Sequence, residues 1–209
     1  MIKGTIVSLN IGNSKNIAAY GEKEVLSAIH KQSVNEQVLH LSVTQIEGDE
    51  QADLVNHGGS DKAVCVYPYE HYHYWNEKLG LSLPIGAFGE NITLRGLTEA
   101  DVFIGDTFQW GDAVVQVSQP RRPCFKVAKR HGVKKFPLYI QETGYSGFYL
   151  RVLQEGNISV NDSLILLERK TDSSIEFVNK VTYHDKKNKE AIHRLLELRE
   201  LSDAWKESL

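Results

Sequence analysis

Cysteine is scarce in this sequence, and long apolar runs are absent. Only Cys65 and Cys124 occur among 209 residues, and no Cys-x-x-Cys spacing is present, so neither a disulfide framework nor a thiol-rich zinc site is expected. No apolar run approaches the ~20 residues that cross a bilayer. The opening MIKGTIVSLNIG also lacks the basic and then apolar layout of a signal peptide. These absences predict a cytoplasmic protein with no membrane partner.

A strong charge of either sign is also missing. Lys and Arg number 24 and Asp and Glu number 27, which gives a formal net charge of -3. That balance provides no broad attraction for a nucleic-acid polymer or for anionic lipid. Any anion that the protein binds must be held by donors gathered in one place.

Every glycine and proline lies before residue 157, among many short apolar segments. Short strands separated by such turn residues are typical of a mainly β fold, and closure into a barrel avoids exposed strand edges. Two strand pairs are predicted. A Gly-Asp turn joins 108–110 to 113–118 as a hairpin, and an Asn-Asp turn joins 158–160 to 164–167.

Two helices are predicted to interrupt the strands. The first covers 69–79 and ends at Gly80, and the second covers 123–131 and ends at Gly132. Proline precedes the first helix and opens the second, while glycine stands just past each end. Both residue types favour those positions for conformational reasons.

The end of the chain, residues 171–209, is rich in charge and in helix-forming residues. Ser174, Asn188 and Ser202 each precede an apolar stripe and can cap a short helix. None of these helices is long enough to be stable alone in water. We therefore expect a helical cluster packed against the barrel or a second subunit, and we predict a homodimer because two-fold dimers are the commonest soluble homo-oligomers.

Cys124 is the residue with the clearest chemical signal. It follows Arg121 and Arg122 at the start of a predicted helix, where unpaired backbone N–H groups and guanidinium charge favour a thiolate, the form that ligates metals. A small buried residue at a strand-to-helix turn is an equal alternative from local chemistry alone. Cys65 lies in an apolar strand with no nearby cation in sequence, and is predicted to be a core residue.

Two glycine-rich loops are further candidates. Residues 56–62, Asn-His-Gly-Gly-Ser-Asp-Lys, allow a ligand phosphate to approach backbone N–H groups, although for this segment alone a tight turn is the favoured explanation. Residues 86–91, Gly-Ala-Phe-Gly-Glu-Asn, end in an acid and an amide that can bond to a heterocycle, or form only a loop before a strand.

Zinc binding by the histidines is not predicted. His71 and His73 lie two apart on a predicted helix, so they point in different directions and cannot easily share a metal with His57. We expect all three at the surface or at an interface.

In combination, the segments 57–64, 67–72, 86–91 and 120–124 resemble the MOSC domain, the C-terminal module of molybdenum cofactor sulfurases. Their order and intervals are similar to those of the stand-alone bacterial YiiM-like branch. Ser60 stands where many relatives are expected to have proline, which affects loop stiffness more than chemistry. The resemblance implies a MOSC-type β-barrel domain over 1–167 with peripheral helices, and a three-helix extension over 168–209.

The resemblance also implies a cofactor and its ligands. The cofactor is the molybdenum cofactor, a pyranopterin dithiolene that holds molybdenum, and Cys124 would be the protein ligand to the metal. Asp61 and Glu90 are predicted to act beside Cys124 in catalysis, as proton-handling groups or as residues that support the metal ligand, with His131 as a further candidate. Ordinary surface hydrogen bonding is the alternative for all three. The predicted cofactor-binding residues are His57, Gly58, Gly59, Lys62, Gly89, Asn91, Arg121 and Arg122.

Catalytic members of the family reduce N-hydroxylated compounds, including N-hydroxylated nucleobases, with electrons from a separate reductase. The resemblance therefore implies a detoxifying oxidoreductase with an external electron donor. The alternative is a carrier that holds cofactor or a persulfide on Cys124 without turnover. No aminotransferase-like sulfurase segment accompanies the domain within these residues, which favours the enzyme.

Overall fold

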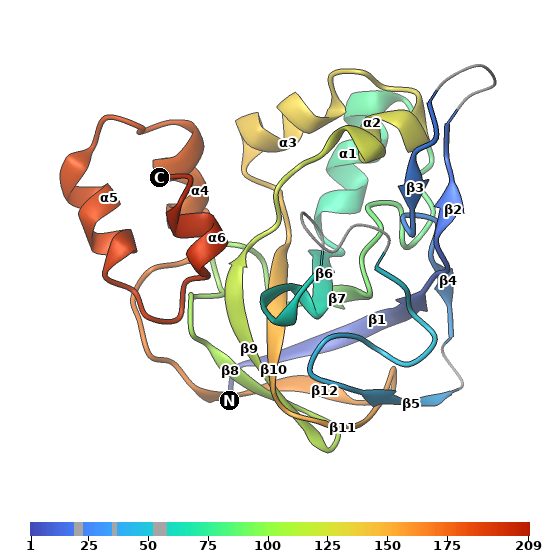
Figure 1. Cartoon of the computed structure of the whole chain (residues 1–209), viewed down its shortest axis with the longest axis horizontal. Helices are drawn as coiled ribbons and strands as arrows, with labels where there is room; N and C mark the ends of the chain where they lie inside the picture. The colour runs from blue at the N-terminus through green and yellow to red at the C-terminus, as the bar shows by residue number, and fades with distance from the viewer. Residues whose placement is uncertain (19–22, 35–36, 52–57) are drawn as a thin grey trace.

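Seven strands close into a β-barrel in a computed structural model that describes residues 1–18, 23–34, 37–51 and 58–209 (Figure 1). Neighbouring strands are antiparallel, except that β6 and β7 are parallel. The closing contact joins the first strand of the barrel to the last one in sequence. In barrel order the strands are β12 (Ser163–Glu168), β8 (Thr107–Trp110), β9 (Ala113–Pro120), β10 (Phe148–Gln154), β6 (Val64–Pro68), β7 (Ile92–Arg95) and β1 (Lys3–Ile11).

The predicted mainly β barrel is confirmed, but only one of the two predicted strand pairs exists. β8 and β9 form the expected hairpin. The segments 158–160 and 164–167 do not pair with each other, because β11 (Gly156–Ser159) pairs with β5 (Val38–Leu41). β12 instead lies between β1 and β8, where it closes the barrel. Closure satisfies both edges of β12, which a local hairpin would leave half unpaired.

Three small strands complete the sheet structure. β4 (Gln32–Ser33) extends the end of β1, and β2 (Lys15–Asn16) pairs with β3 (Leu26–Ser27) as a short hairpin. Figure 1 shows this hairpin beside the helices at one end of the barrel.

A second apolar cluster lies under three helices, outside the barrel core. α1 (His71–Leu79), α2 (Phe125–His131) and α3 (Phe136–Thr143) contribute to it. Its centre is the stack of Tyr67 on Phe88, with ring centroids 3.7 Å apart. α3 was not predicted from the sequence; its eight residues follow α2 after a short turn.

The ends of the first two helices agree with the sequence signals better than the beginnings do. Gly80 and Gly132 both adopt left-handed conformations, with φ of 63° and 69°. Both helices begin two residues later than predicted. Cys124 therefore caps α2 from an extended conformation, with φ -123° and ψ 163°, instead of lying within its first turn.

The three predicted helix caps of the tail are confirmed. They begin α4 (Ile175–Tyr183), α5 (Lys189–Leu196) and α6 (Asp203–Lys206). Ser174, Asn188 and Ser202 accept hydrogen bonds from backbone N–H groups three residues ahead, at 3.1, 3.0 and 3.2 Å. Each side chain satisfies one of the donors that a helix start leaves unpaired.

The apolar stripes of the tail are buried within the same chain. Val178, Leu195 and Trp205 are all 0% exposed and belong to the same apolar cluster as the barrel interior. The barrel therefore supplies the partner surface that these short helices need. The homodimer stays a prediction, and these stripes are not available to form it. Among the described residues, no helix is long and apolar enough to cross a lipid bilayer.

Because Trp205 is buried in a core shared with the barrel, Trp205→Ala should destabilise the whole protein by about 3–5 kcal/mol. Urea unfolding followed by fluorescence and circular dichroism should give one transition, at lower urea. The matched control is Leu196→Ala in the same tail, where the side chain is exposed and the expected loss is about 0.5 kcal/mol or less. Separate unfolding of the tail before an unshifted barrel transition would contradict the shared core.

Candidate functional site

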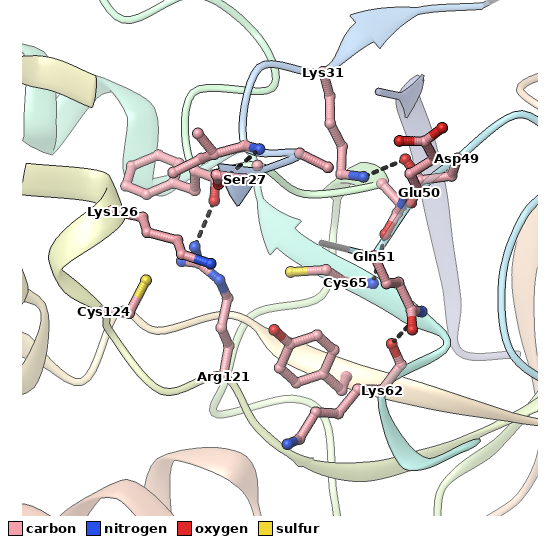
Figure 2. Close-up of a pocket in the computed structure, with 16 residues that line it drawn as sticks. Ser27, Lys31, Asp49, Glu50, Gln51, Lys62, Cys65, Arg121, Cys124 and Lys126 are labelled. Carbon is pink, nitrogen blue, oxygen red and sulfur yellow. Dashed lines mark hydrogen bonds and ion pairs between the residues drawn. The ribbon is translucent and has the colours of Figure 1, made fainter. Parts of the chain in front are cut away.

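A pocket opens at the end of the barrel that carries α2, between the start of that helix and the β2–β3 hairpin. Its walls come from residues 27–31, the loop at 49–51, the strands β6 and β10, the loop at 88–91 and the segment 121–126. Figure 2 shows Cys124 and Lys126 on one side of the pocket, with the Arg121 side chain reaching up beside them, and Lys31 and Asp49 on another side.

Both cysteines of the protein line this pocket, as free thiols. Cys124 is half-buried at the start of α2, and its carbonyl oxygen accepts the Val127 N–H at 3.2 Å. Cys65 is only 6% exposed in β6. Burial raises the pKa of the Cys65 thiol to about 11, although the charge of Arg121 opposes the rise. Cys65 is therefore a neutral thiol at pH 7.

The prediction of Cys65 as a core residue is right about burial and incomplete about position. All five residues of β6 are buried, so the strand shows no alternation that distinguishes its two faces. One face of β6 borders the pocket at the end of the barrel instead of the apolar core. The burial pattern of the strand is the same on both faces, so the sequence gives no sign of this difference. A second thiol at the site was therefore missed.

Arg121 is the buried cation of the pocket. It follows β9 directly and is 6% exposed. Its Nη2 donates to the carbonyl oxygen of Phe88, whereas its buried Nη1 has no acceptor among the described residues. Burial alone would lower the pKa of this guanidinium, but Cys65, Tyr149 and Cys124 raise it above the ordinary value. A permanently charged donor thus lacks one partner, and a buried donor without a partner favours an anionic ligand.

Three lysines add to the positive charge of the lining: Lys31, Lys62 and Lys126. Lys31 forms an ion pair with Asp49 that is buried on both sides. With Arg121, the lining contains four cations against the two carboxylates of Asp49 and Glu50. This excess gathers in one place the donors that an anion requires in a chain with a net negative charge.

Asn91 and Asp49 build the wall of the pocket. The Asn91 Oδ1 accepts the Cys65 N–H at 3.0 Å, and its Nδ2 donates to Asn10 O at 3.2 Å and Asp49 Oδ2 at 2.8 Å. The other Asp49 oxygen accepts the Gly12 N–H at 2.8 Å. The polar atoms of Asn91 are thus engaged in holding β1, β6 and β7 together.

Gly89 also belongs to the lining, and its conformation depends on the absence of a side chain. Its φ is 76°, and a Cβ atom there would lie 2.9 Å from the Ile29 Cγ1. The structure therefore brings together Cys124, Arg121, Lys62, Gly89 and Asn91 of the predicted site residues.

Three other predicted site residues lie outside the lining. Asp61 forms an ion pair with Arg151 at 2.8 Å. Glu90 is fully buried, where it accepts the Phe88 N–H at 3.0 Å and the Thr93 hydroxyl at 2.9 Å, so it shapes the loop at 86–90. Arg122 turns toward the tail.

Gly58 and Gly59 also lie outside the lining. Gly59 precedes the short 3-10 helix η1 (Ser60–Lys62) with φ 97°. His57 falls outside the described residues. Among the described residues of this glycine-rich loop, 58–62, Lys62 is the one that reaches the pocket.

One prediction about the location of the histidines is wrong. His71, expected at the surface or an interface, is buried, with its Nε2 2.6 Å from Glu99 and its ring stacked on Tyr145 at 3.8 Å. His73 is exposed as expected. His131 donates from Nε2 to the Ala87 carbonyl oxygen at 2.8 Å. Within the described part of the chain, no three His, Cys, Asp or Glu side chains are grouped as metal ligands.

Comparison with known proteins agrees with this architecture. The MOSC domain family model matches residues 53–165, and the YiiM-like 3-alpha helix domain model matches residues 174–209. The uncharacterized protein YflK of Bacillus subtilis (strain 168) is 50% identical over 205 residues, which cover 98% of this chain and 92% of that protein. A reductase of Gibberella moniliformis (strain M3125 / FGSC 7600) is 38% identical over 173 residues, 79% of this chain but 30% of that protein.

Among solved structures, YiiM from Geobacillus stearothermophilus superposes with a TM-score of 0.83 at 41% identity, covering 98% of this chain and 96% of that one. The likeness thus includes both the barrel and the three helices of the tail. The chain belongs to the MOSC domain family, in its YiiM-like branch.

Proposed function

We propose that the pocket binds the molybdenum cofactor through Cys124 and that the protein reduces N-hydroxylated small molecules, N-hydroxylated nucleobases among them. The observation that carries this proposal is the position of Cys124 in one cation-lined pocket with the unpartnered, buried Nη1 of Arg121. The reductase relative supports an oxidoreductase, and the detoxification of N-hydroxylated bases is the role that such a reaction would serve.

The residues of the pocket fit this cofactor chemically. A thiolate is a soft ligand of the kind that suits a metal bound by sulfur, and only a deprotonated thiol can ligate. Cys124 is the more accessible thiol, whereas burial keeps Cys65 protonated at neutral pH. A guanidinium with a free donor suits the phosphate of a pterin, and Lys62 and Lys126 line the same pocket.

When bound, the cofactor supplies the two-electron chemistry that converts an N–OH group to N–H, with two protons consumed and one water released. Cys124 would hold the metal and Arg121 the anionic end of the group. The buried wall around Cys65 and Asn91 would limit the entry of water. Asp61 and Glu90 have no part in this proposal, because neither residue lines the pocket and their carboxylates are engaged with Arg151 and with the Phe88 N–H.

We propose that the two electrons come from a separate reductase. The matched module makes up 30% of the Gibberella protein, so that chain contains further sequence in which electron supply can reside. A homodimer also remains part of the proposal.

Cys124→Ser should abolish molybdenum retention with little effect on folding, because a hydroxyl occupies similar space but is a poor substitute for a soft thiolate. The loss of metal affinity should exceed ~10–100-fold, which is the loss expected when a residue that only hydrogen-bonds to a metal ligand is removed. Molybdenum per protein, measured by elemental analysis after expression in a cofactor-producing host, tests this. Cys65→Ser is the matched control and should keep both metal and activity. Normal molybdenum content in Cys124→Ser would refute the ligand assignment.

Cofactor-loaded protein supplied with dithionite should convert an N-hydroxylated purine to the amino form over many turnovers, because an enzyme returns to its starting state. Chromatographic analysis of the product, with substrate in roughly tenfold or greater molar excess over protein, distinguishes repeated turnover from one conversion per protein molecule. A carrier would form no such product. Stable sulfane sulfur on Cys124 that passes to an acceptor, without reduction of the purine, would favour the carrier instead.

A further inference from the structure

A basic surface lies beside the mouth of the pocket, on α2, α3 and the turn that joins them. Residues 121–143 contain seven of the 24 Lys and Arg in the chain and one acid, Glu142. The chain as a whole has a net charge of -3. Positive charge is therefore concentrated in this segment, and Cys124 lies within it.

The cations of this segment divide between the interior and the surface. Lys126 lines the pocket, and Arg130 donates to the carbonyl oxygens of Gly86, at 2.6 Å, and Ile29. Lys134 and Lys135 are exposed instead. The inward residues serve the site and the loops around it, which leaves the outward pair without a role in either.

Two large apolar side chains are exposed on the same two helices. Phe125, directly after Cys124, is 59% exposed, and Leu138 on α3 is 49% exposed. Phe125 and Lys129 lie four residues apart on α2 and so share one face of the helix. We call Phe125, Lys129, Lys134, Lys135 and Leu138 the basic ridge. Exposed aromatics bordered by charge are typical of protein-binding surfaces.

The positions of the two outward lysines are unfavourable for the helix that they precede. Lys135 is the N-cap residue of α3 and makes no capping hydrogen bond with its side chain, and Lys134 lies just before it. A helix start carries partial positive charge, so cations there are destabilising. A residue choice that opposes local stability points to a role beyond folding.

The β2–β3 hairpin carries a further cation, Lys15, whose charge acts on the same histidine as that of Arg130 in α2. His30 follows the β2–β3 hairpin, which Figure 1 shows beside α2. Burial lowers the pKa of His30, and the charges of Arg130 and Lys15 lower it further. Cations from two segments that are far apart in sequence therefore act on the same region.

We propose that the basic ridge is the docking surface of an acidic electron-donor protein, which delivers its electrons at the mouth of the pocket. This inference rests on the proposed reductase function. α2 rises about 1.5 Å per residue, so its seven residues span about 10 Å from the Cys124 cap to the turn that contains Lys134 and Lys135. A partner seated on Phe125 would lie beside the start of α2, where Cys124 lines the pocket. Two electrons leave the donor for each N–OH group converted to N–H and water.

The electrostatics predict a weak, fast and salt-sensitive complex. Electron-transfer partners generally bury less than about 1,200 Å², and complementary charge mainly accelerates their encounter. The effect should disappear near 1 M salt, where the screening length falls to about 3 Å.

The test compares two double charge reversals in cofactor-loaded, full-length protein. Lys134→Glu with Lys135→Glu reverses the ridge, and Lys187→Glu with Lys189→Glu makes the same change at two exposed positions of the tail. The probes are an acidic flavodoxin and an acidic plant-type ferredoxin. Binding is titrated at low ionic strength, and turnover is measured with each reduced probe and, separately, with dithionite.

The ridge variant should bind the probes and use their electrons roughly tenfold less well, or worse, at low ionic strength, while its dithionite-driven turnover and thermal midpoint stay close to wild type. The tail variant should match wild type throughout. Phe125→Ala should weaken probe binding by several-fold and leave dithionite-driven turnover unchanged, because this side chain is exposed.

Two results would overturn the proposal while leaving the reductase function in place. Both require that turnover with dithionite stays normal. In the first, the ridge variant binds the probes as tightly as wild type does. In the second, the ridge variant and the tail variant lose probe binding to the same extent. Failure of dithionite to support turnover in wild-type loaded protein would instead refute the proposed function, and the docking role with it.

Discussion

The exit of the chain from β9 is the constraint on which the pocket and the tail both depend. The Arg121 N–H donates to the Gly147 carbonyl oxygen at 3.0 Å, beside the pairing of β9 with β10. Gly147 has φ 71°, and a Cβ atom there would overlap the Val66 carbonyl oxygen. Only glycine permits this approach. From this point Arg121 turns into the pocket and Arg122 toward the tail, with its guanidinium 4.6 Å from the centre of the Trp205 ring.

Burial of the Arg121 charge lowers the stability of the fold, and a bound anion would offset that loss. A guanidinium taken out of water loses hydration worth several kcal/mol, and one donor nitrogen has no acceptor in the described part of the chain to offset that loss. An anion that bonds to this nitrogen binds the native state alone, so it stabilises the fold in proportion to its affinity. A site built in this way couples retention of the ligand to stability of the barrel end.

Local chemistry is what made parts of this structure predictable. A cap depends on one side chain and a backbone N–H three residues away, and Ser174, Asn188 and Ser202 could therefore be identified without tertiary information. The pairing of β11 with β5 could not, because its partner lies more than a hundred residues away. The same limit applies to Cys65, whose strand is buried on both faces.

Adjacent arginines posed a related difficulty. Arg121 and Arg122 carry the same charge and the same sequence signal, yet one lines the pocket and the other stacks on Trp205. Their directions depend on the barrel and on the tail, and the sequence of residues 120–124 contains no information about either. Composition and spacing can thus place a cationic site near Cys124 without assigning its individual donors.

The first residues of the helices differ between the tail and the region beside the pocket, and this difference helps to distinguish residues chosen for folding from residues chosen for function. α4, α5 and α6 each begin at a Ser or Asn that accepts a capping hydrogen bond, and each has an acid in its first turn. α3 has neither feature and is preceded by two lysines. The same chain therefore follows the electrostatic preference of helices where the helices only pack against the barrel. It departs from that preference beside the pocket, where positive charge at the surface has another use.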